Sequence, residues 1–199
     1  MTVIGLLLAA GQGRRMGRPK ALVRGEDGVP WVVSSSSVLA EAGCQEVLVV
    51  LGAQAEQAAA LLETASTGTG SAGTGRTRIR HVVAPDWADG MSASLRAGLT
   101  AIKDTTHDAA LVHLVDLPDV GADVVRRLLA RAERSTLARA GYHGVPGHPV
   151  LIGREHWAPL TQVLSGDEGA KRYLRSHQTD LVESGDLATG HDVDQMSDN

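Results

Sequence analysis

The sequence has no phenylalanine, and aromatic residues make up only 3% of its 199 positions. Its single cysteine, Cys44, excludes an intramolecular disulfide and any zinc site built from several cysteines, and it fits a reducing compartment. No apolar run reaches the length of a membrane span, and the run at residues 1–10 lacks the basic residues that precede the apolar part of a signal peptide. We therefore expect a cytoplasmic protein with an aliphatic core.

The sequence also lacks an excess of positive charge, since its formal net charge is −4. A protein with this balance has no general attraction for nucleic acid or anionic lipid, so we expect neither nucleic acid nor a membrane as partner. The length and the 43% apolar content are those of one globular unit. We expect a single domain over residues 1–199.

Short apolar runs alternate with longer segments of helical period, which indicates an α/β fold with a mostly parallel sheet. We predict strands over residues 3–9, 46–51, 79–83, 109–115, 137–141, 149–152 and 179–183. Helical stripes lie over residues 31–42, 91–102, 124–129 and 157–164, and a last helix is predicted from an N-cap at Asp167 to about His177.

A glycine-rich basic segment, LAAGQGRRMGRPK, follows the first strand at residues 8–20. Glycines let backbone N–H groups approach a polyphosphate, and the arginines and Lys20 can neutralise it. The segment is not a dinucleotide fingerprint, because Gly17 comes one residue late, and it is not a Walker A loop, because Lys20 precedes Ala21. A solvated basic turn is the alternative.

This segment resembles the signature of the MobA-like NTP transferase family. The resemblance implies a Rossmann-like three-layer α/β/α nucleotidyltransferase fold with a mostly parallel mixed sheet. It also implies that the loop wraps the nucleotide phosphates and that Arg15 and Lys20 contact them as catalytic residues. We expect both cations to be exposed without ligand. The implied nucleotide-binding residues in this loop are Leu8, Ala9, Ala10, Gly11, Gly13, Arg15 and Lys20.

Asp116 follows the predicted strand 109–115, where a strand-end carboxylate facing a triphosphate is an adequate Mg²⁺ ligand, although a turn or N-cap role is the alternative. The resemblance places a catalytic metal-binding aspartate here, in a Gly-Asp-x-Pro turn. Val115 replaces that glycine, and we expect it to narrow the backbone's approach to the nucleotide. Near the carboxyl terminus the resemblance makes Asp194 the second metal ligand, with a solvated tail as the alternative.

Two further segments resemble the branch of the family that includes molybdenum cofactor cytidylyltransferases. In GMSASLRAG, residues 90–98, the resemblance implies that Gly90 and Ser94 lie beside the nucleotide. In the Gly-His-Pro turn it implies that Gly147 and His148 line the acceptor side. Ala84 stands where the branch commonly has asparagine, which removes one polar contact.

We therefore expect a Mg²⁺-dependent enzyme that moves CMP from CTP to the phosphate of molybdopterin and releases pyrophosphate. A molybdoenzyme that receives the product is a further expected partner. Two alternatives remain open. One is a guanylyl- or sugar-phosphate nucleotidyltransferase that shares the loop, and the other is a non-catalytic carrier that binds nucleotide or molybdopterin.

Overall fold

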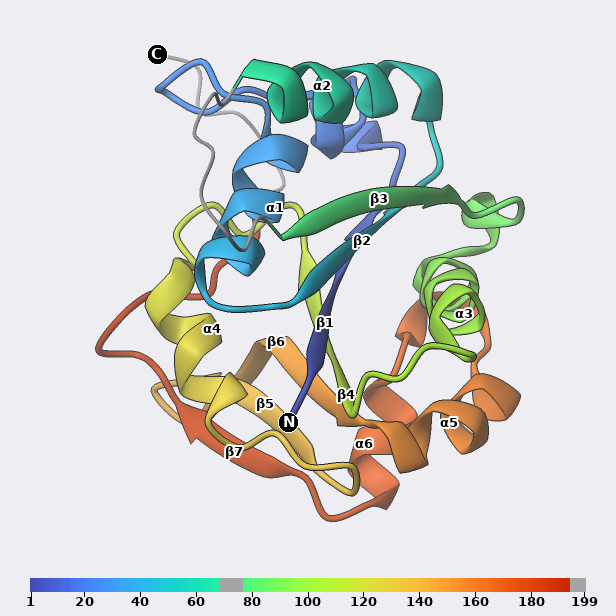
Figure 1. Cartoon of the computed structure of the whole chain (residues 1–199), viewed down its shortest axis with the longest axis vertical. Coiled ribbons are helices and arrows are strands. Elements are labelled where there is room, and N and C mark those ends of the chain that lie inside the picture. Colours follow the sequence, from blue (N-terminus) through green and yellow to red (C-terminus); the bar gives the residue numbers. More distant parts are fainter. Residues whose placement is uncertain (69–76, 194–199) are drawn as a thin grey trace.

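The computed structural model describes residues 1–68 and 77–193, and a seven-stranded sheet lies at the centre of this part of the chain (Figure 1). The strands are β1 (Val3–Ala9), β2 (Glu46–Leu51), β3 (Arg78–Val83), β4 (Ala109–Leu114), β5 (Leu137–Tyr142), β6 (Val145–Gly153) and β7 (Asp180–Glu183). Their order is β3-β2-β1-β4-β6-β5-β7. Only β6 runs antiparallel to its neighbours, so the sheet is mixed and mostly parallel, as expected.

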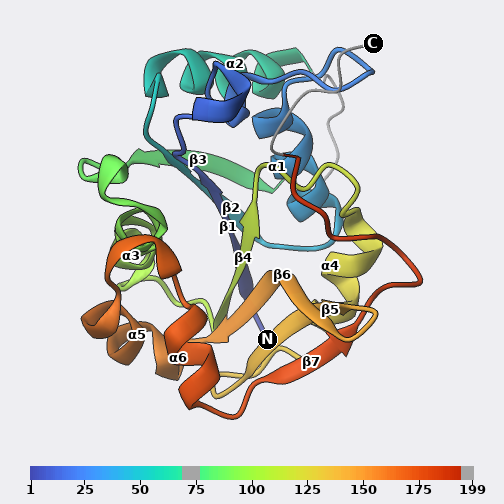
Figure 2. The same cartoon turned by 180° about the vertical axis from the view of Figure 1, so that it is seen from behind.

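Helices cover both faces of the sheet (Figures 1 and 2). One face packs against α1 (Trp31–Glu41), α2 (Ala55–Gly68) and α4 (Ala122–Leu129). The other packs against α3 (Met91–Ile102), α5 (Trp157–Val163) and α6 (Lys171–Ser176). This is the three-layer α/β/α arrangement that the family resemblance implies. Within residues 1–68 and 77–193, no helix is long and apolar enough to cross a membrane.

β1 is buried at every position because β2 and β4 flank it and helices cover both of its faces. Successive side chains enter opposite apolar clusters: Leu7 packs toward α1 and α4, whereas Leu6 packs toward α3. Gly98 lets α3 approach closely, since an added Cβ there would lie 2.7 Å from Leu6 Cδ1. The uninterrupted apolar run of β1 is therefore the sequence of a central strand.

The carboxyl ends of β1 and β4 lie side by side. The two strands pair in parallel with Leu8 opposite Leu114, so the loops that follow both strands emerge at one edge of the sheet. Open α/β sheets bind ligands at this edge. The register thus brings the glycine-rich loop next to Asp116.

Three elements differ from the sequence-based expectation. We predicted no element over α2, and β6 begins at Val145, four residues earlier than expected. The predicted N-cap role of Asp167 is wrong, because α6 begins at Lys171 after Ala170. Asp167 instead lies in a 3₁₀ turn, Gly166–Glu168, which ends at Gly169 with a φ of 55°.

Candidate active site

A cavity of about 830 Å³ opens where β1 and β4 end. Its walls come from residues within 8–20, 87–94 and 114–116, together with Asp167 and Asp192. Most of the predicted nucleotide-site residues lie in this lining: Leu8, Ala10, Gly11, Gly13, Arg15, Lys20, Gly90, Ser94 and Asp116. Ala9 does not, because its side chain is buried in the apolar cluster under α1.

The backbone of the glycine-rich loop is held by one tight turn. Gly13 has a φ of 60°, and an added Cβ there would lie 2.0 Å from the carbonyl oxygen of Arg18. The N–H of Met16 donates to the Gly13 carbonyl at 2.9 Å, which closes the turn Arg14–Met16. Gly11 differs, since a Cβ there would have no heavy atom within 4 Å. Its open surface on the cavity lets an anion approach the backbone closely.

Lys20 and Asp116 form an ion pair in the cavity wall. Lys20 Nζ donates to Asp116 Oδ2 at 2.7 Å, and the two side chains are only 16% and 17% exposed. The expectation of an exposed Lys20 is therefore wrong, because the 3₁₀ turn Lys20–Leu22, anchored by buried Ala21, lies beside the end of β4. Arg15 is exposed, as expected.

Val115, which stands in place of the family's glycine, does not strain the chain. Its φ lies outside the left-handed region, so the position does not require glycine. Its N–H donates to the Leu8 carbonyl at 3.3 Å, and its side chain is 5% exposed in the apolar cluster that includes Leu7 and Leu117. Val115 borders the cavity, but its side chain lies mostly in the core. It therefore narrows the backbone's approach to the nucleotide less than expected.

The start of α3 meets the turn Gly166–Glu168. Gly90 has a φ of 107°, and an added Cβ would lie 2.0 Å from Asp167 Oδ1. Ser92 Oγ donates to the Ser165 carbonyl at 2.9 Å and accepts from the Gly169 N–H at 3.1 Å. Ser92 thus connects the start of α3 to both ends of this turn. The Gly-Asp-x-Gly sequence of residues 166–169 is the local pattern that marks this turn.

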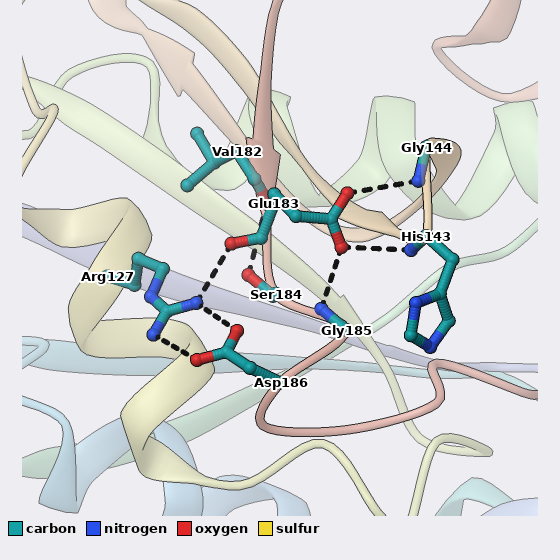
Figure 3. A network of polar contacts seen from close by, with 8 residues as sticks. All are labelled: Arg127, His143, Gly144, Val182, Glu183, Ser184, Gly185 and Asp186. Carbon is teal, nitrogen blue, oxygen red and sulfur yellow. Dashed lines mark hydrogen bonds and ion pairs between the residues drawn. The ribbon is translucent and has the colours of Figure 1, made fainter.

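Residues 184–193, here called the C-terminal strap, run from the end of β7 back to the cavity. Its first part is fixed by the network in Figure 3. The Glu183 carboxylate accepts hydrogen bonds from the backbone N–H groups of Gly144, Gly185 and His143 at 2.9–3.0 Å, and these hold its pKa below the usual range. Arg127 pairs with both carboxylate oxygens of Asp186, at 2.5 and 2.9 Å.

The far part of the strap is attached beside Asp116. Asp119 Oδ2 accepts from the N–H and the hydroxyl of Thr189 at 2.7 and 2.6 Å, and the Val193 N–H donates to the Asp116 carbonyl at 3.0 Å. These bonds place Asp192 in the cavity lining. Asp194, the expected second metal ligand, lies outside the described residues. Sequence reasoning passed over Asp192, which lies two residues before Asp194.

The predicted acceptor residues Gly147 and His148 lie on β6 and do not line the cavity. The Gly147 carbonyl accepts from Arg139, and the His148 carbonyl accepts from the Tyr142 hydroxyl at 2.7 Å. Burial lowers the pKa of His148 to about 4, with the charge of Arg139 as a second cause. The imidazole of His148 is therefore neutral at pH 7.

The donor set fits a divalent cation held jointly with a nucleotide. Asp116 and Asp192, two residues with carboxylate side chains, line one cavity, and Mg²⁺ takes one or two carboxylates with phosphate oxygens and water. Within residues 1–68 and 77–193, no group of three or more His, Cys, Asp or Glu side chains is arranged to hold a metal ion alone. Phosphate oxygens would therefore complete the coordination.

Comparison with known proteins agrees with this geometry. Residues 5–181 match the model of the MobA-like NTP transferase domain. The chain is 35% identical to nicotine blue oxidoreductase of Paenarthrobacter nicotinovorans, over 98% of this chain and 93% of that protein. It is 32% identical to molybdenum cofactor guanylyltransferase of Rhodobacter capsulatus, over 79% of this chain and 66% of that protein.

Solved structures show the same fold. The homologue of Mycobacterium tuberculosis Rv0371c from Mycobacterium sp. strain JC1 superposes with a TM-score of 0.72 at 26% identity, covering 97% of this chain and 90% of the other. Rv0371c of M. tuberculosis H37Rv in complex with manganese gives a TM-score of 0.67 at 22% identity, covering 92% and 89%. With its family match over most of its length and this shared α/β/α fold, the chain belongs to the MobA-like NTP transferase family and is a nucleotidyltransferase.

Proposed function

We propose that this enzyme transfers CMP from CTP to the phosphate of molybdopterin and releases pyrophosphate, with Mg²⁺ as cofactor. The observation that carries the proposal is one cavity at the carboxyl edge of the sheet that is lined by the glycine-rich loop, by Lys20 and by Asp116. Backbone N–H groups and cations bind a triphosphate, and carboxylates bind its metal. The proposed setting is the cytoplasm, with a molybdoenzyme receiving the product.

The proposed reaction needs positioning and charge stabilisation more than proton transfer. An oxygen of the acceptor phosphate attacks the α-phosphorus of the NTP, a new phosphoanhydride bond forms, and the bond to the β-phosphate oxygen breaks. A phosphate monoester is largely ionised at pH 7, since its second pKa is about 6, so no general base is required. The loop backbone holds the triphosphate, while Arg15 and Lys20 stabilise the charge that develops on it.

Asp116 and Asp192 are the proposed protein ligands of Mg²⁺. When bound, the ion neutralises charge on the phosphate oxygens. Asp116 accepts from Lys20 through Oδ2, and a carboxylate retains further lone pairs for a cation. When a triphosphate enters, Lys20 exchanges part of its contact with Asp116 for the phosphates. The ion pair thus holds the lysine close to the place where it acts.

Support for CTP comes from the combined match of residues 90–95 and 147–149 to the cytidylyl branch, and not from any residue seen to read a base. Ala84, which stands where the branch commonly has asparagine, is fully buried, and its N–H donates to the Leu51 carbonyl at 2.8 Å. The R. capsulatus relative is named a guanylyltransferase, which favours GTP as the second candidate donor.

Pyrophosphate release with molybdopterin and each of the four NTPs, with and without Mg²⁺, tests the proposal. Fastest release with CTP supports cytidylyl transfer, and fastest release with GTP replaces it with guanylyl transfer. If pyrophosphate is released only when a sugar phosphate is supplied, the acceptor is a sugar phosphate and not molybdopterin. If an NTP binds but no pyrophosphate is released, the carrier function is favoured. Because one relative is named an oxidoreductase, reduction of nicotine blue by NADH or NADPH is assayed in parallel. Pigment turnover without pyrophosphate release would overturn the proposal.

A further inference from the structure

Trp87 brings an aromatic ring to the nucleotide cavity. Among the described residues that line this cavity, no other is aromatic, and the chain has just three tryptophans, two tyrosines and no phenylalanine. Trp31 and Trp157 are 7% and 4% exposed and belong to the two apolar clusters, whereas Trp87 is only partly buried. Apolar surface that stays open in a cavity is typical of a ligand-binding site.

The indole is held against the backbone at the ends of β1 and β2. Trp87 begins the 3₁₀ turn Trp87–Asp89, and the Gly90 N–H donates to the Trp87 carbonyl at 3.3 Å. At Gly52, directly after β2, an added Cβ would lie 2.6 Å from Trp87 Cγ and 2.6 Å from the Ala10 carbonyl oxygen. Position 52 thus has no room for a side chain beside the ring. A ring held in this way loses little conformational freedom when a ligand stacks on it.

The strand order places Trp87 and Asp116 on opposite sides of the glycine-rich loop. Four parallel strands run in the order β3-β2-β1-β4, which can be followed in Figure 2. The loop follows β1, Asp116 follows β4, and Trp87 lies against the end of β2. The ends of β2 and β4 are two strand spacings apart, roughly 10 Å. Lys20 and the strap with Asp192 are attached at Asp116, so these charged groups lie toward β4 and away from the indole.

The segment 87–94, which carries the indole, contains no lysine, arginine or histidine. It lines the cavity with Trp87, Ala88, Gly90, Met91 and Ser94. Asp167, which lies against Gly90, adds a negative charge to this wall. Such a wall repels a triphosphate. A base suits it, because stacking needs an aromatic surface and the amino groups of cytosine and guanine can donate to a carboxylate or a hydroxyl.

We propose that the base of the bound NTP stacks on the indole of Trp87, while its phosphates lie on the glycine-rich loop toward Asp116. This inference rests on the proposed function and deepens it, because it gives the direction in which the nucleotide crosses the cavity. Every base has a π face, so stacking contributes to the affinity for each NTP. Trp87 therefore binds the base without choosing between CTP and GTP.

Tripolyphosphate, which has the phosphates of an NTP without base or ribose, makes the test specific. Calorimetry with Mg²⁺ measures the affinities of CTP, GTP and tripolyphosphate. We expect Trp87→Leu to weaken both nucleotides at least tenfold, about 1.4 kcal/mol, and Trp87→Phe to weaken them less because it keeps an aromatic face. Both variants should bind tripolyphosphate as the wild type does. Trp31→Phe, a buried tryptophan on the opposite face of the sheet, is the matched control and should leave all three affinities unchanged.

Tryptophan fluorescence gives a second readout. A base stacked on an indole quenches its emission, so saturating CTP should lower the emission of the wild type and of Trp31→Phe. The emission of Trp87→Phe should not change, because Trp31 and Trp157 lie outside the cavity lining. Quenching that persists in Trp87→Phe would contradict the inference.

Other roles of Trp87 predict different results. If the indole only supports the glycine-rich loop through Gly52, Trp87→Leu weakens tripolyphosphate as much as the nucleotides, which would overturn the proposal. If the indole contacts the pterin of the acceptor, NTP affinity stays unchanged and only the KM for molybdopterin rises, which would also overturn it. A wild-type enzyme that binds NTPs but releases no pyrophosphate would refute the proposed function, whereas the comparison with tripolyphosphate would still decide where the base lies. A wild type that binds no NTP would refute both.

Discussion

A double-mutant cycle on the ion pair between Lys20 and Asp116 tests the core of the proposed site. The pair is 2.7 Å long and its side chains are 16% and 17% exposed, so it is screened less than a surface pair but is not fully desolvated. Exposed pairs contribute about 0–1 kcal/mol, and breaking a fully buried pair costs about 3–5 kcal/mol. We therefore expect a coupling free energy of about 1–2 kcal/mol between Lys20→Met and Asp116→Asn.

Urea unfolding of the wild type, the two single variants and the double variant measures this coupling. The exposed pair of Arg126 and Asp123, 2.6 Å apart with side chains 45% and 74% exposed, is the control and should couple by less than about 1 kcal/mol. With Mg²⁺ and NTP bound, the Lys20–Asp116 coupling should decrease, because Lys20 then contacts phosphate. Additive effects in the free enzyme, or near-normal pyrophosphate release by Asp116→Asn, would refute the reasoning.

Three further predictions concern Gly13, Asp192 and two buried histidines. Gly13→Ala should destabilise the protein more than Gly17→Ala and should weaken NTP binding. Both glycines have a positive φ, which costs an alanine about 1–2 kcal/mol. Of the two, only Gly13 would place an added Cβ against a backbone oxygen, at 2.0 Å. Equal losses in the two variants, by urea unfolding, would contradict this. Asp192→Asn should lower Mg²⁺-dependent pyrophosphate release and leave stability unchanged; unaltered release at limiting Mg²⁺ would remove Asp192 from the site. Burial lowers the pKa of His113 to about 3 and that of His148 to about 4, whereas unfolded histidines titrate near 6.5. The unfolded state thus binds more protons between these pKa values, so the free energy of unfolding should be highest above pH 6.5. It should fall toward pH 4 by up to about 1.4 kcal/mol per pH unit for each histidine. A free energy of unfolding that does not change from pH 7 to pH 5 would contradict this prediction.

The central layer of the fold could be predicted because its strands are buried on both faces. β1, β2 and β4 are mostly aliphatic, and their bounds agree with the sequence-based expectation to within one residue. α2 was missed because its inward positions are mostly alanine, as at Ala58, which gives a weak helical period. The position of Asp167 was misjudged for a related reason: local capping patterns say nothing of the contact with Gly90, which depends on how α3 packs.

The geometry of the site depends on contacts between distant residues. Lys20 and Asp116 are 96 positions apart, and their pairing follows from the register of β1 and β4, which no local pattern encodes. Asp192 reaches the cavity only because the strap is attached at Asp119 and beside Asp116. Sequence reasoning could therefore name the loop and the strand-end acid, whereas the half-buried lysine and the acid of the strap required the structure.

The C-terminal strap also bears on the order in which the enzyme matures on the ribosome. A chain that emerges amino end first has made β1, β2 and β4, and thus both Lys20 and Asp116, by residue 116, whereas the strap is made only after β5, β6 and β7. Parts of a chain that bury their own core can fold before synthesis ends. The nucleotide-binding half can therefore assemble on the nascent chain, while Asp192 arrives only after the strands β5, β6 and β7 have been made. Binding of nucleotide and competence for catalysis would then be acquired at different moments of synthesis.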